Sequence, residues 1–301
     1  MKTPLVSIAL LTYQHENYIL DCIKGLLSQT YTNMELLIVD DASTDATLNI
    51  IDKNMQELEK KFVRVEVIRH TNNTGNIAQN FNELLKIANG EYIKTAAGDD
   101  ALLPCCVETL TEYLEKNREY ALAYSNAYVV SDTWHIDKNF KKTTLYGNTF
   151  EPPSFEDSFL ALFESDYVAA PTIMIRSNIY KKYGYYDESK IYEDWDMLLR
   201  LARWERFGYI NKVLVYYRMA QTSVSNNNTR KKFANSYNFR IRVLNTYLRF
   251  VNSEKRILIQ KSVLDDYIKT AKQNKYYEYF IILIFRKYKL LIKNLLKNMN
   301  Y

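Results

Sequence analysis

The sequence predicts an α/β protein with a mostly parallel sheet flanked by helices, followed by a basic, helical C-terminal extension. Two observations support this prediction. Short apolar runs alternate with segments of helical spacing over residues 5–96, which is typical of a parallel sheet with helices on both faces. From about residue 231 onward, the spacing of the apolar residues is helical throughout.

The first part of the chain alternates regularly. The run over residues 5–12 is apolar on both faces, as expected of a buried strand. Further strands are expected over 35–39, 63–69 and 92–96, and helices over 19–27, 46–60 and 77–88. Right-handed crossovers between such strands place all four in one parallel sheet.

The rhythm changes after Pro104. A helix is expected over 105–116, strands over 120–130, 172–176 and 213–217, and a second helix over 194–204. We divide the chain into residues 1–104, residues 105–225 as the second half of the same domain, and the extension 226–301.

Composition narrows the class of protein. Apolar residues make up 47% of 301, enough for a large core. The three cysteines, Cys22, Cys105 and Cys106, lack metal-site spacing, so reduced thiols and a cytoplasmic location are expected. We expect no export signal and no membrane-spanning helix, because no apolar run approaches the ~18 residues that a span needs.

Acidic pairs follow two of the predicted strands. Asp40 and Asp41 end the second strand, and Asp99 and Asp100 follow the fourth. One such acid could be a helix cap, but ligands of open α/β sheets bind at the carboxyl ends of strands. A nucleotide diphosphate with a divalent metal ion would bring these acids together. Asp41 would then accept the base N–H, and Tyr13 would stack on the base.

The glycines exclude the common nucleotide-binding alternatives. None of the seven are spaced as G-x-G-x-x-G or as a Walker loop, which argues against a dehydrogenase or a P-loop NTPase. The glycine-rich entry loop of a sugar nucleotidyltransferase is missing too.

A third acidic cluster, residues 192–196, begins a predicted helix. Acids there could simply complement the helix dipole. Transfer of a sugar with inversion, however, needs a base near the acceptor hydroxyl. A carboxylate of this cluster could supply that base.

Together these residues resemble the family-2 glycosyltransferases, which have the Rossmann-like GT-A fold. The resemblance runs from about Val6 to Ser225. The motifs that carry it are Val6-Ser7-Ile8, Thr12-Tyr13, Ser28-Gln29-Thr30, Leu37 to Asp45, Asn73-Thr74-Gly75, Asn80, Gly90 to Ile93, Gly98-Asp99-Asp100, Gly184 to Glu188, Glu193-Asp194 and Tyr217-Arg218. Each motif alone is weak, but their order and spacing are specific.

The resemblance implies a role for each matching residue. The donor nucleotide would be bound by Thr12, Tyr13, Asp41, Asn80 and Asp99. A divalent metal ion, Mn²⁺ or Mg²⁺, would be held by Asp100 and Asp99, and the catalytic base would be Asp194. Glu193, Trp195 and Arg218 would lie near the acceptor or the phosphates.

Two positions depart from the family pattern. Ala97 stands where the family often has an aspartate, two residues before Asp99. Ala220 stands where it often has a histidine that helps to hold the metal ion or the diphosphate. The metal ion would then depend on Asp100 and the diphosphate, or Arg218 and Ser225 would help with the phosphates.

The extension differs from the body in charge. Residues 1–225 carry 23 Lys/Arg and 31 Asp/Glu, whereas residues 226–301 carry 17 and 4. Over 276–299 one helical face is apolar, with basic residues beside it. The apolar positions are Ile281, Ile284, Phe285, Tyr288, Leu291, Ile292, Leu295, Leu296 and Met299. This pattern is typical of a helix at an anionic membrane surface, although a helix packed on the catalytic domain or on a second subunit of a homodimer would also fit.

We therefore expect an inverting hexosyltransferase that moves a sugar from a nucleotide sugar, UDP-hexose or UDP-N-acetylhexosamine, to a lipid-linked oligosaccharide. Synthesis of capsule or lipopolysaccharide O-antigen, peripherally on the inner face of the cytoplasmic membrane, is the expected setting, with no nucleic-acid partner. A polyprenyl-phosphate sugar transferase and a catalytically inactive nucleotide-binding partner of another transferase are the alternatives. The sequence names neither the donor sugar, the acceptor, nor the linkage.

Overall fold

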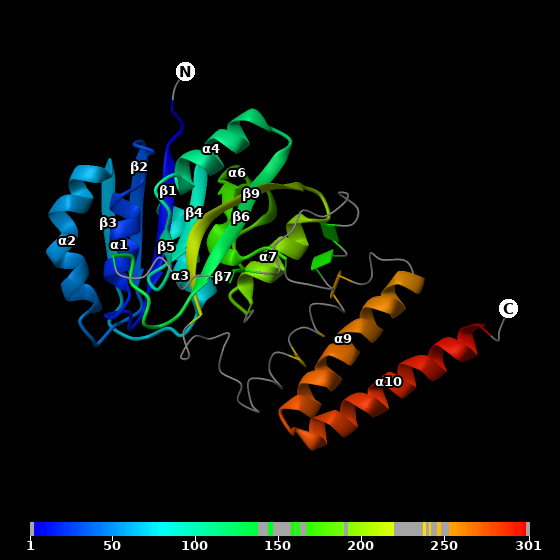
Figure 1. The fold of residues 1–301 in the computed structure, drawn as a ribbon. Helices are drawn as coiled ribbons and strands as arrows, with labels where there is room; N and C mark the ends of the chain where they lie inside the picture. The colour runs from blue at the N-terminus through cyan, green and yellow to red at the C-terminus, as the bar shows by residue number, and fades with distance from the viewer. Residues whose placement is uncertain are drawn as a thin grey trace. The chain divides into compact units, whose positions relative to one another are not determined.

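A nine-stranded sheet organises residues 6–218 in a computed structural model of the protein (Figure 1). Its strand order is β3-β2-β1-β4-β8-β6-β9-β5, with β7 paired to β6. The strands are β1 (Val6–Thr12), β2 (Met34–Asp40), β3 (Arg64–Arg69), β4 (Tyr92–Ala97), β5 (Ala101–Leu102), β6 (Tyr120–Val130), β7 (Thr144–Leu145), β8 (Met174–Arg176) and β9 (Arg206–Arg218).

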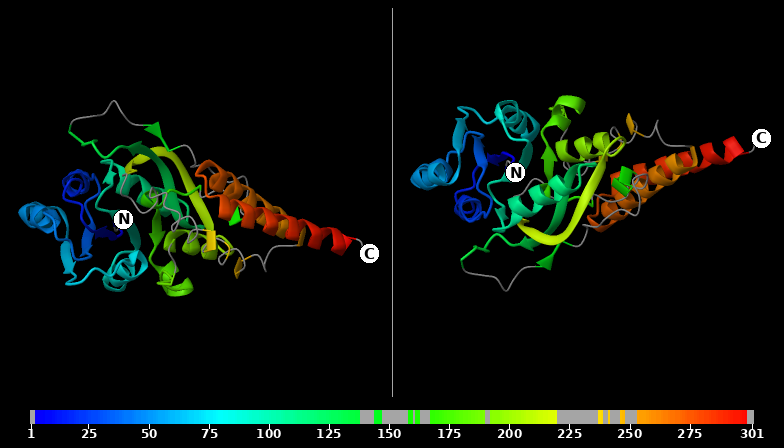
Figure 2. Two further views of the ribbon diagram at one scale, coloured as in Figure 1. Left: turned by 90° about the horizontal axis from the view of Figure 1, so that it is seen from below. Right: turned by 90° about the horizontal axis from the view of Figure 1, so that it is seen from above.

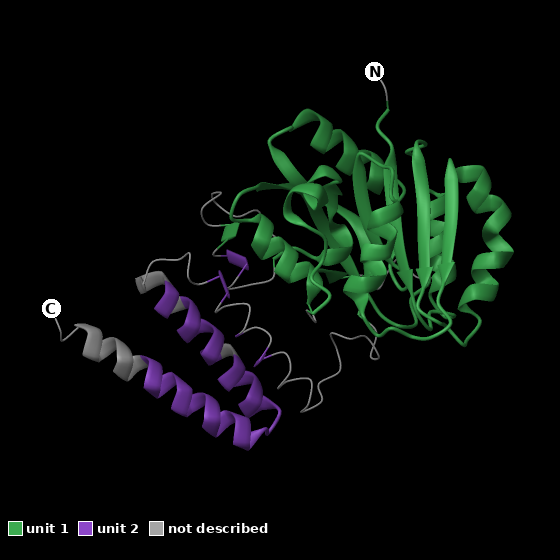
Figure 3. Cartoon of the chain, turned by 180° about the vertical axis from the view of Figure 1, so that it is seen from behind, with its two compact units in different colours: residues 1–159, 166–226 green, residues 160–165, 227–301 purple. Residues whose placement is uncertain are grey.

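The chain separates into two units. Residues 1–159 and 166–226 form unit 1, and residues 160–165 and 227–301 form unit 2 (Figure 3). The structure describes residues 3–137, 144–146, 158–159, 161–162, 167–189, 192–219, 237–238, 241, 246–247 and 253–298. The division at residue 104 that we expect from the sequence lies within unit 1 and stays a prediction.

The first four strands form the parallel sheet that the sequence predicts. β3, β2, β1 and β4 pair in parallel in that order. The helices α1 (Ile19–Leu27) and α2 (Thr47–Lys61) cover one face, and α3 (Ile77–Ile87) covers the other (Figure 2). With helices on both sides, β1 and β2 bury nearly every side chain, which explains their continuous apolar runs.

The second half of the sheet is mixed. β8 pairs antiparallel with both β4 and β6, while β6 pairs in parallel with β9. The sequence predicts only the end of the last strand, because Asn211 and Lys212 interrupt its apolar pattern. β9 nevertheless continues from Arg206, paired with β6 through register shifts near Asn126. The helices of this half are α4 (Cys106–Lys116), α6 (Asn178–Tyr183) and α7 (Glu193–Leu201).

Unit 2 is built on two long helices, α9 (Ser253–Gln273) and α10 (Tyr277–Asn298). They lie side by side after a reversal at Lys275, whose φ is 57°. Val263 and Tyr267 of α9 and Leu283 of α10 are buried within unit 2, and the Tyr267 ring packs against that of Tyr237. Among the described residues, no helix is both long and apolar enough to cross a bilayer.

Candidate active site

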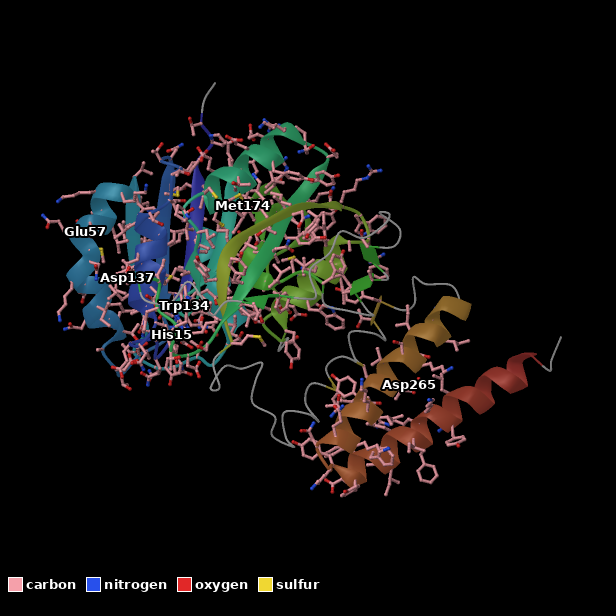
Figure 4. The ribbon with its side chains drawn as sticks, in the orientation of Figure 1. His15, Glu57, Trp134, Asp137, Met174 and Asp265 are labelled. Carbon is pink, nitrogen blue, oxygen red and sulfur yellow. The ribbon has the colours of Figure 1, made fainter. Side chains whose placement is uncertain are left out.

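The carboxyl ends of β1, β2 and β4 meet at one edge of the sheet, as their parallel pairing requires. Thr12 lies opposite Asp40, and Leu11 lies opposite Ala97, two residues before Asp99. The two acidic pairs predicted from the sequence are therefore neighbours in space. His15 and Trp134 mark this end of the sheet in Figure 4.

A cavity of about 860 Å³ opens at this edge. Most of the residues predicted for the site line it, namely Tyr13, Asp41, Asn80, Asp99, Asp100, Glu193, Asp194 and Arg218. Thr12 and Trp195 are buried instead, and the Thr12 hydroxyl lies 3.2 Å from His15 Nδ1. The cavity thus unites the expected donor residues with the third acidic cluster, which lies almost 100 residues further along the chain.

Asp41 is the most fully hydrogen-bonded of these acids. Its Oδ1 accepts the Thr74 N–H at 2.8 Å and lies 3.0 Å from His70 Nδ1, and its Oδ2 accepts the Gly75 N–H at 3.2 Å. Burial opposes its charge, but the hydrogen bonds from Thr74 and His70 outweigh burial and lower the pKa of Asp41. Asp41 is therefore an ionised acceptor that also anchors the loop beside it.

That loop, residues 73–75, is shaped by its own sequence. Gly75 has a φ of 62°, in the left-handed region where a side chain would be strained. Asn76 then caps α3 by accepting the Gln79 N–H at 3.1 Å. Asn80, one turn into α3, is buried and accepts the Thr74 hydroxyl at 3.2 Å, so the loop is held from both ends.

Asp99 and Asp100 form the second acidic pair. Asp100 is buried and its Oδ1 accepts the Arg218 N–H at 2.8 Å. Burial, together with the neighbouring Asp99 carboxylate, raises the pKa of Asp100 well above its usual value. Two neighbouring carboxylates, of which Asp100 is buried and Asp99 half-buried, are stabilised by a cation, and carboxylate oxygens are the ligands that Mg²⁺ and Mn²⁺ prefer.

The acidic pair therefore fits a divalent metal ion that takes its other ligands from the donor. Among the described residues, no cluster of three or more His, Cys, Asp or Glu side chains could hold a metal ion. A site made of two carboxylates and two phosphate oxygens is common for ions that bind nucleotides.

Arg218 is buried, and its guanidinium is turned towards protein carbonyls. Nε donates to the Asp99 carbonyl at 2.9 Å, and Nη1 donates to the carbonyls of Ser131 and Trp134 at 2.7 and 2.9 Å. Nη2 donates to Asp21 Oδ2 at 3.2 Å. Arg218 lines the cavity as expected, but these contacts tie the end of β9 to the acidic pair, and a direct phosphate contact stays a prediction.

Glu193 and Asp194 begin α7 and line the same cavity. Asp194 Oδ1 accepts the N–H of Trp195 at 2.8 Å. Burial raises the pKa of Asp194. Burial and the neighbouring Asp194 raise the pKa of Glu193 to about 8. A carboxylate with a raised proton affinity in a cavity is suited to accept a proton from a substrate hydroxyl.

Sequence reasoning did not predict several residues of the site. His70 bridges Asp41 and Glu83, with Nε2 at 2.8 Å from the Glu83 carboxylate. Because His70 directly follows the third strand, the rule that ligands bind at strand ends could have predicted it. Asp21 stands on the buried face of α1, where an acid in an apolar stripe is itself a signal. Tyr18 lies against the Arg218 guanidinium, and no sequence pattern marks it.

Comparison with known proteins shows the family to which the chain belongs. The sequence model of glycosyl transferase family 2 matches residues 7–184. The UDP-Glc:alpha-D-GlcNAc-diphosphoundecaprenol beta-1,3-glucosyltransferase WfaP of Escherichia coli is 30% identical over 224 residues, which are 74% of this chain and 80% of that protein.

Solved structures share the fold. TarS of S. aureus in complex with UDP-GlcNAc superposes with a TM-score of 0.59 at 18% identity, over 88% of this chain and 81% of TarS. The mannosyltransferase PcManGT from Pyrobaculum calidifontis, in complex with GDP-Man and Mn²⁺, gives 0.58 at 11% identity, over 98% and 88% of the two chains. With the family model covering residues 7–184 of 301, the chain belongs to glycosyl transferase family 2 and is a glycosyltransferase of the GT-A fold.

Proposed function

We propose that the enzyme transfers a hexose or N-acetylhexosamine from a UDP-linked donor to a hydroxyl group of a lipid-linked oligosaccharide in capsule or O-antigen synthesis. One observation carries this proposal. A single cavity brings the strand-end carboxylates together with Glu193 and Asp194. The name of WfaP, a UDP-glucose-dependent enzyme acting on a diphosphoundecaprenol-linked sugar, supports the donor and the acceptor class.

The donor would lie along the carboxyl edge of the sheet. Tyr13 has an exposed ring that can stack on the base, and Asp41 is an ionised acceptor for the base N–H. Asp99 and Asp100 would hold a divalent metal ion, which neutralises charge on the diphosphate when bound. The PcManGT complex, which contains Mn²⁺ with its nucleotide sugar, supports this assignment.

Asp194 would act as the catalytic base. It takes the proton of the acceptor hydroxyl while that oxygen forms its bond to the anomeric carbon. The bond from that carbon to the diphosphate breaks, and its electron pair leaves with the diphosphate oxygen. Attack opposite the leaving group inverts the anomeric carbon, so the base and the diphosphate would lie on opposite sides of the sugar. Asp194 and the acidic pair line the same cavity, which supports these two roles.

Calorimetric titration of UDP with and without Mn²⁺ tests the donor site. We expect Mn²⁺ to tighten UDP binding in the wild type and in the control Asp52→Ala, an exposed acid of α2 paired with Arg69. Asp100→Ala should lose most of the gain from Mn²⁺ while keeping metal-free binding. A wild-type chain with no affinity for UDP, or an Asp100→Ala variant with the full gain, would contradict the assignment.

We also propose that α10 binds an anionic membrane surface, where a lipid-linked acceptor resides. Ile281, Phe285 and Tyr288 are exposed along one side of the helix, Phe285 at 72%. Ile284 is half-buried, and the other predicted positions of the apolar face, from Leu291 onward, have side chains outside the described residues. The basic side chains nearby would attract anionic headgroups.

Two of these basic side chains make contacts within unit 2. Lys287 pairs with Asp265 of α9, which Figure 4 labels, and Arg286 donates to the Tyr237 hydroxyl at 2.9 Å. Lys289 is exposed and free to face a membrane from the described part of the helix. Deleting α10 would uncover α9, so substitution of exposed residues is the sharper experiment.

Co-sedimentation with vesicles of phosphatidylglycerol and phosphatidylcholine tests this proposal on the full chain. We expect the wild type to sediment at low salt and less at high salt, because salt screens the attraction. Phe285→Ser combined with Ile281→Ser should remain in the supernatant, and the control Leu145→Ser, an exposed apolar residue of β7, should not change sedimentation. A different result would identify a dimer interface instead: the wild type would be a dimer that does not sediment with vesicles, and the double variant would be a monomer.

A further inference from the structure

Asp21 is an acid on the buried face of helix α1. It lies between the core residues Ile19 and Cys22 and is itself 4% exposed. An acid in such a position is costly unless it is paired and hydrogen-bonded. Asp21 meets both conditions, since Oδ2 accepts from Arg218 Nη2 at 3.2 Å and Oδ1 accepts the Ile136 N–H at 3.1 Å.

Arg218 connects Asp21 with the acidic pair. Its main-chain N–H donates to the Asp100 carboxylate, and its Nε donates to the Asp99 carbonyl. The guanidinium lies 4.5 Å from the centre of the Tyr18 ring and 5.5 Å from that of Trp134. These contacts fix the guanidinium in place, so its charge cannot move away from the acidic pair.

A fixed positive charge beside two carboxylates lowers their affinity for a cation. Arg218 alone would cancel part of the negative charge that attracts a divalent ion, because charges in a protein interior interact strongly over several ångströms. Asp21 supplies one compensating negative charge, since its Oδ2 accepts a hydrogen bond from Nη2 of the same guanidinium. With Asp21 present, the charges of Arg218 and Asp21 largely cancel, so the guanidinium opposes a cation at Asp99 and Asp100 less.

We propose that Asp21 is a positioning residue of the donor site. It neutralises Arg218, so that Arg218 holds Asp99 and Asp100 in place without weakening their attraction for a divalent cation. The inference rests on the proposed donor site, and it assigns to the site an acid of α1 that does not line the cavity.

A purely structural role for Asp21 makes a different prediction. Breaking a buried ion pair lowers stability, whatever the site binds. If that were its only role, the substitution Asp21→Asn would lower the melting temperature and leave the Mn²⁺ affinity of the folded protein unchanged. The two roles are therefore separated by measuring metal affinity and stability on the same variants.

The experiment measures Mn²⁺ binding by electron paramagnetic resonance of the free ion, with and without UDP, together with melting temperature. We expect Asp21→Asn to weaken Mn²⁺ binding about tenfold, and Asp21→Glu to restore most of it because the charge returns. Metal-free UDP binding should change little. The control Asp137→Asn removes an exposed acid that pairs with Lys24, and it should bind Mn²⁺ as the wild type does.

Each result decides the proposal. Asp21→Asn with wild-type Mn²⁺ affinity would overturn it, as would failure of Asp21→Glu to bind better than Asp21→Asn. If Asp21→Asn does not fold, the double variant Asp21→Asn with Arg218→Gln removes both charges together. A loss of Mn²⁺ affinity of about tenfold in that variant would overturn the proposal, because no uncompensated positive charge is left. A wild type that binds neither UDP nor Mn²⁺ would contradict the donor site itself and the role of Asp21 with it.

Discussion

Two groups of carboxylates line the cavity, and their pKa values are shifted in opposite directions. We call Asp41, Asp99 and Asp100 the donor side and Glu193 and Asp194 the acceptor side, after their proposed roles, and compare Asp41 with the acceptor side. On the donor side, Asp41 accepts hydrogen bonds at both oxygens, and its pKa is lowered despite burial. On the acceptor side, burial raises the pKa of Asp194 and, with the help of Asp194, that of Glu193. In the roles proposed above, donor recognition would rest on a carboxylate that stays charged, and proton transfer would rest on a pair that readily takes up a proton.

This contrast follows from local structure. Asp41 ends a strand beside a loop whose backbone N–H groups point at it, so its charge is satisfied before any ligand binds. Asp194 lies at the first turn of a helix, where its carboxylate accepts hydrogen bonds from the N–H of Trp195 and from its own N–H. A binding group benefits from being preorganised, whereas a base benefits from being poorly satisfied.

The largest effect should come from the acceptor side. Asp194→Asn keeps the size of the side chain but removes the base, so kcat should fall by roughly two or more orders of magnitude. Affinity for UDP should stay within a few-fold of the wild type, as measured by calorimetry. A variant that retains wild-type turnover would show that another group takes the proton, and the contrast between the two sides would fail.

A smaller effect is expected on the donor side. Asp41→Asn should weaken UDP binding by about tenfold or more, because a charged hydrogen bond to the base and the anchor of loop 73–75 are both lost. The loss should be the same with and without Mn²⁺, unlike that of Asp100→Ala. Calorimetry in both conditions checks this, with melting curves to confirm that the variant is folded. Equal UDP affinity in the wild type and Asp41→Asn would remove the base contact from the site.

The smallest effect concerns stability and pH. The folded-state pKa of Glu193 is about 8, raised from its usual value of 4.5 by burial and by Asp194. A raised pKa means that the protonated carboxyl stabilises the ligand-free protein below pH ~4.5, and that this stability is lost as pH rises through about 8. Glu193→Gln mimics the protonated form, so its melting temperature should match the wild type near pH 5 and exceed it near pH 9.

Melting curves across this range, with Glu57→Gln as a control that removes an exposed carboxylate of α2, would check the prediction. A difference between Glu193→Gln and the wild type that does not grow with pH would mean that Glu193 is ionised throughout.

The donor side could be predicted from sequence because it depends on short-range rules. Parallel strands end at one edge of a sheet, so Asp41 and Asp99 had to be neighbours once their strands were assigned. The structure confirms the GT-A fold and brings these residues to one cavity. Their individual roles remain predictions, because no ligand contact is part of the geometry.

The full length of β9 and the contacts of Arg218 could not be predicted, because they depend on long-range pairings that no local sequence pattern encodes. β9 is longer than its apolar run, because it follows β6 through register shifts. The guanidinium of Arg218 turns to the backbone of residues 131–134, and only the folded loop shows those carbonyls converging. Long-range contacts of this kind are set by tertiary packing, which propensity and periodicity do not report.

The insertion of β8 between β4 and β6 has a consequence for how the chain folds. Tyr92 of β4 pairs with Arg176, a partner synthesised more than 80 residues later. Until that segment arrives, β4 is an edge strand with unpaired backbone groups, the kind of edge that recruits other chains. The nascent protein must therefore keep its first four strands from aggregating until the second half is made. A fragment that ended at residue 104 would keep β4 as an unpaired edge strand permanently.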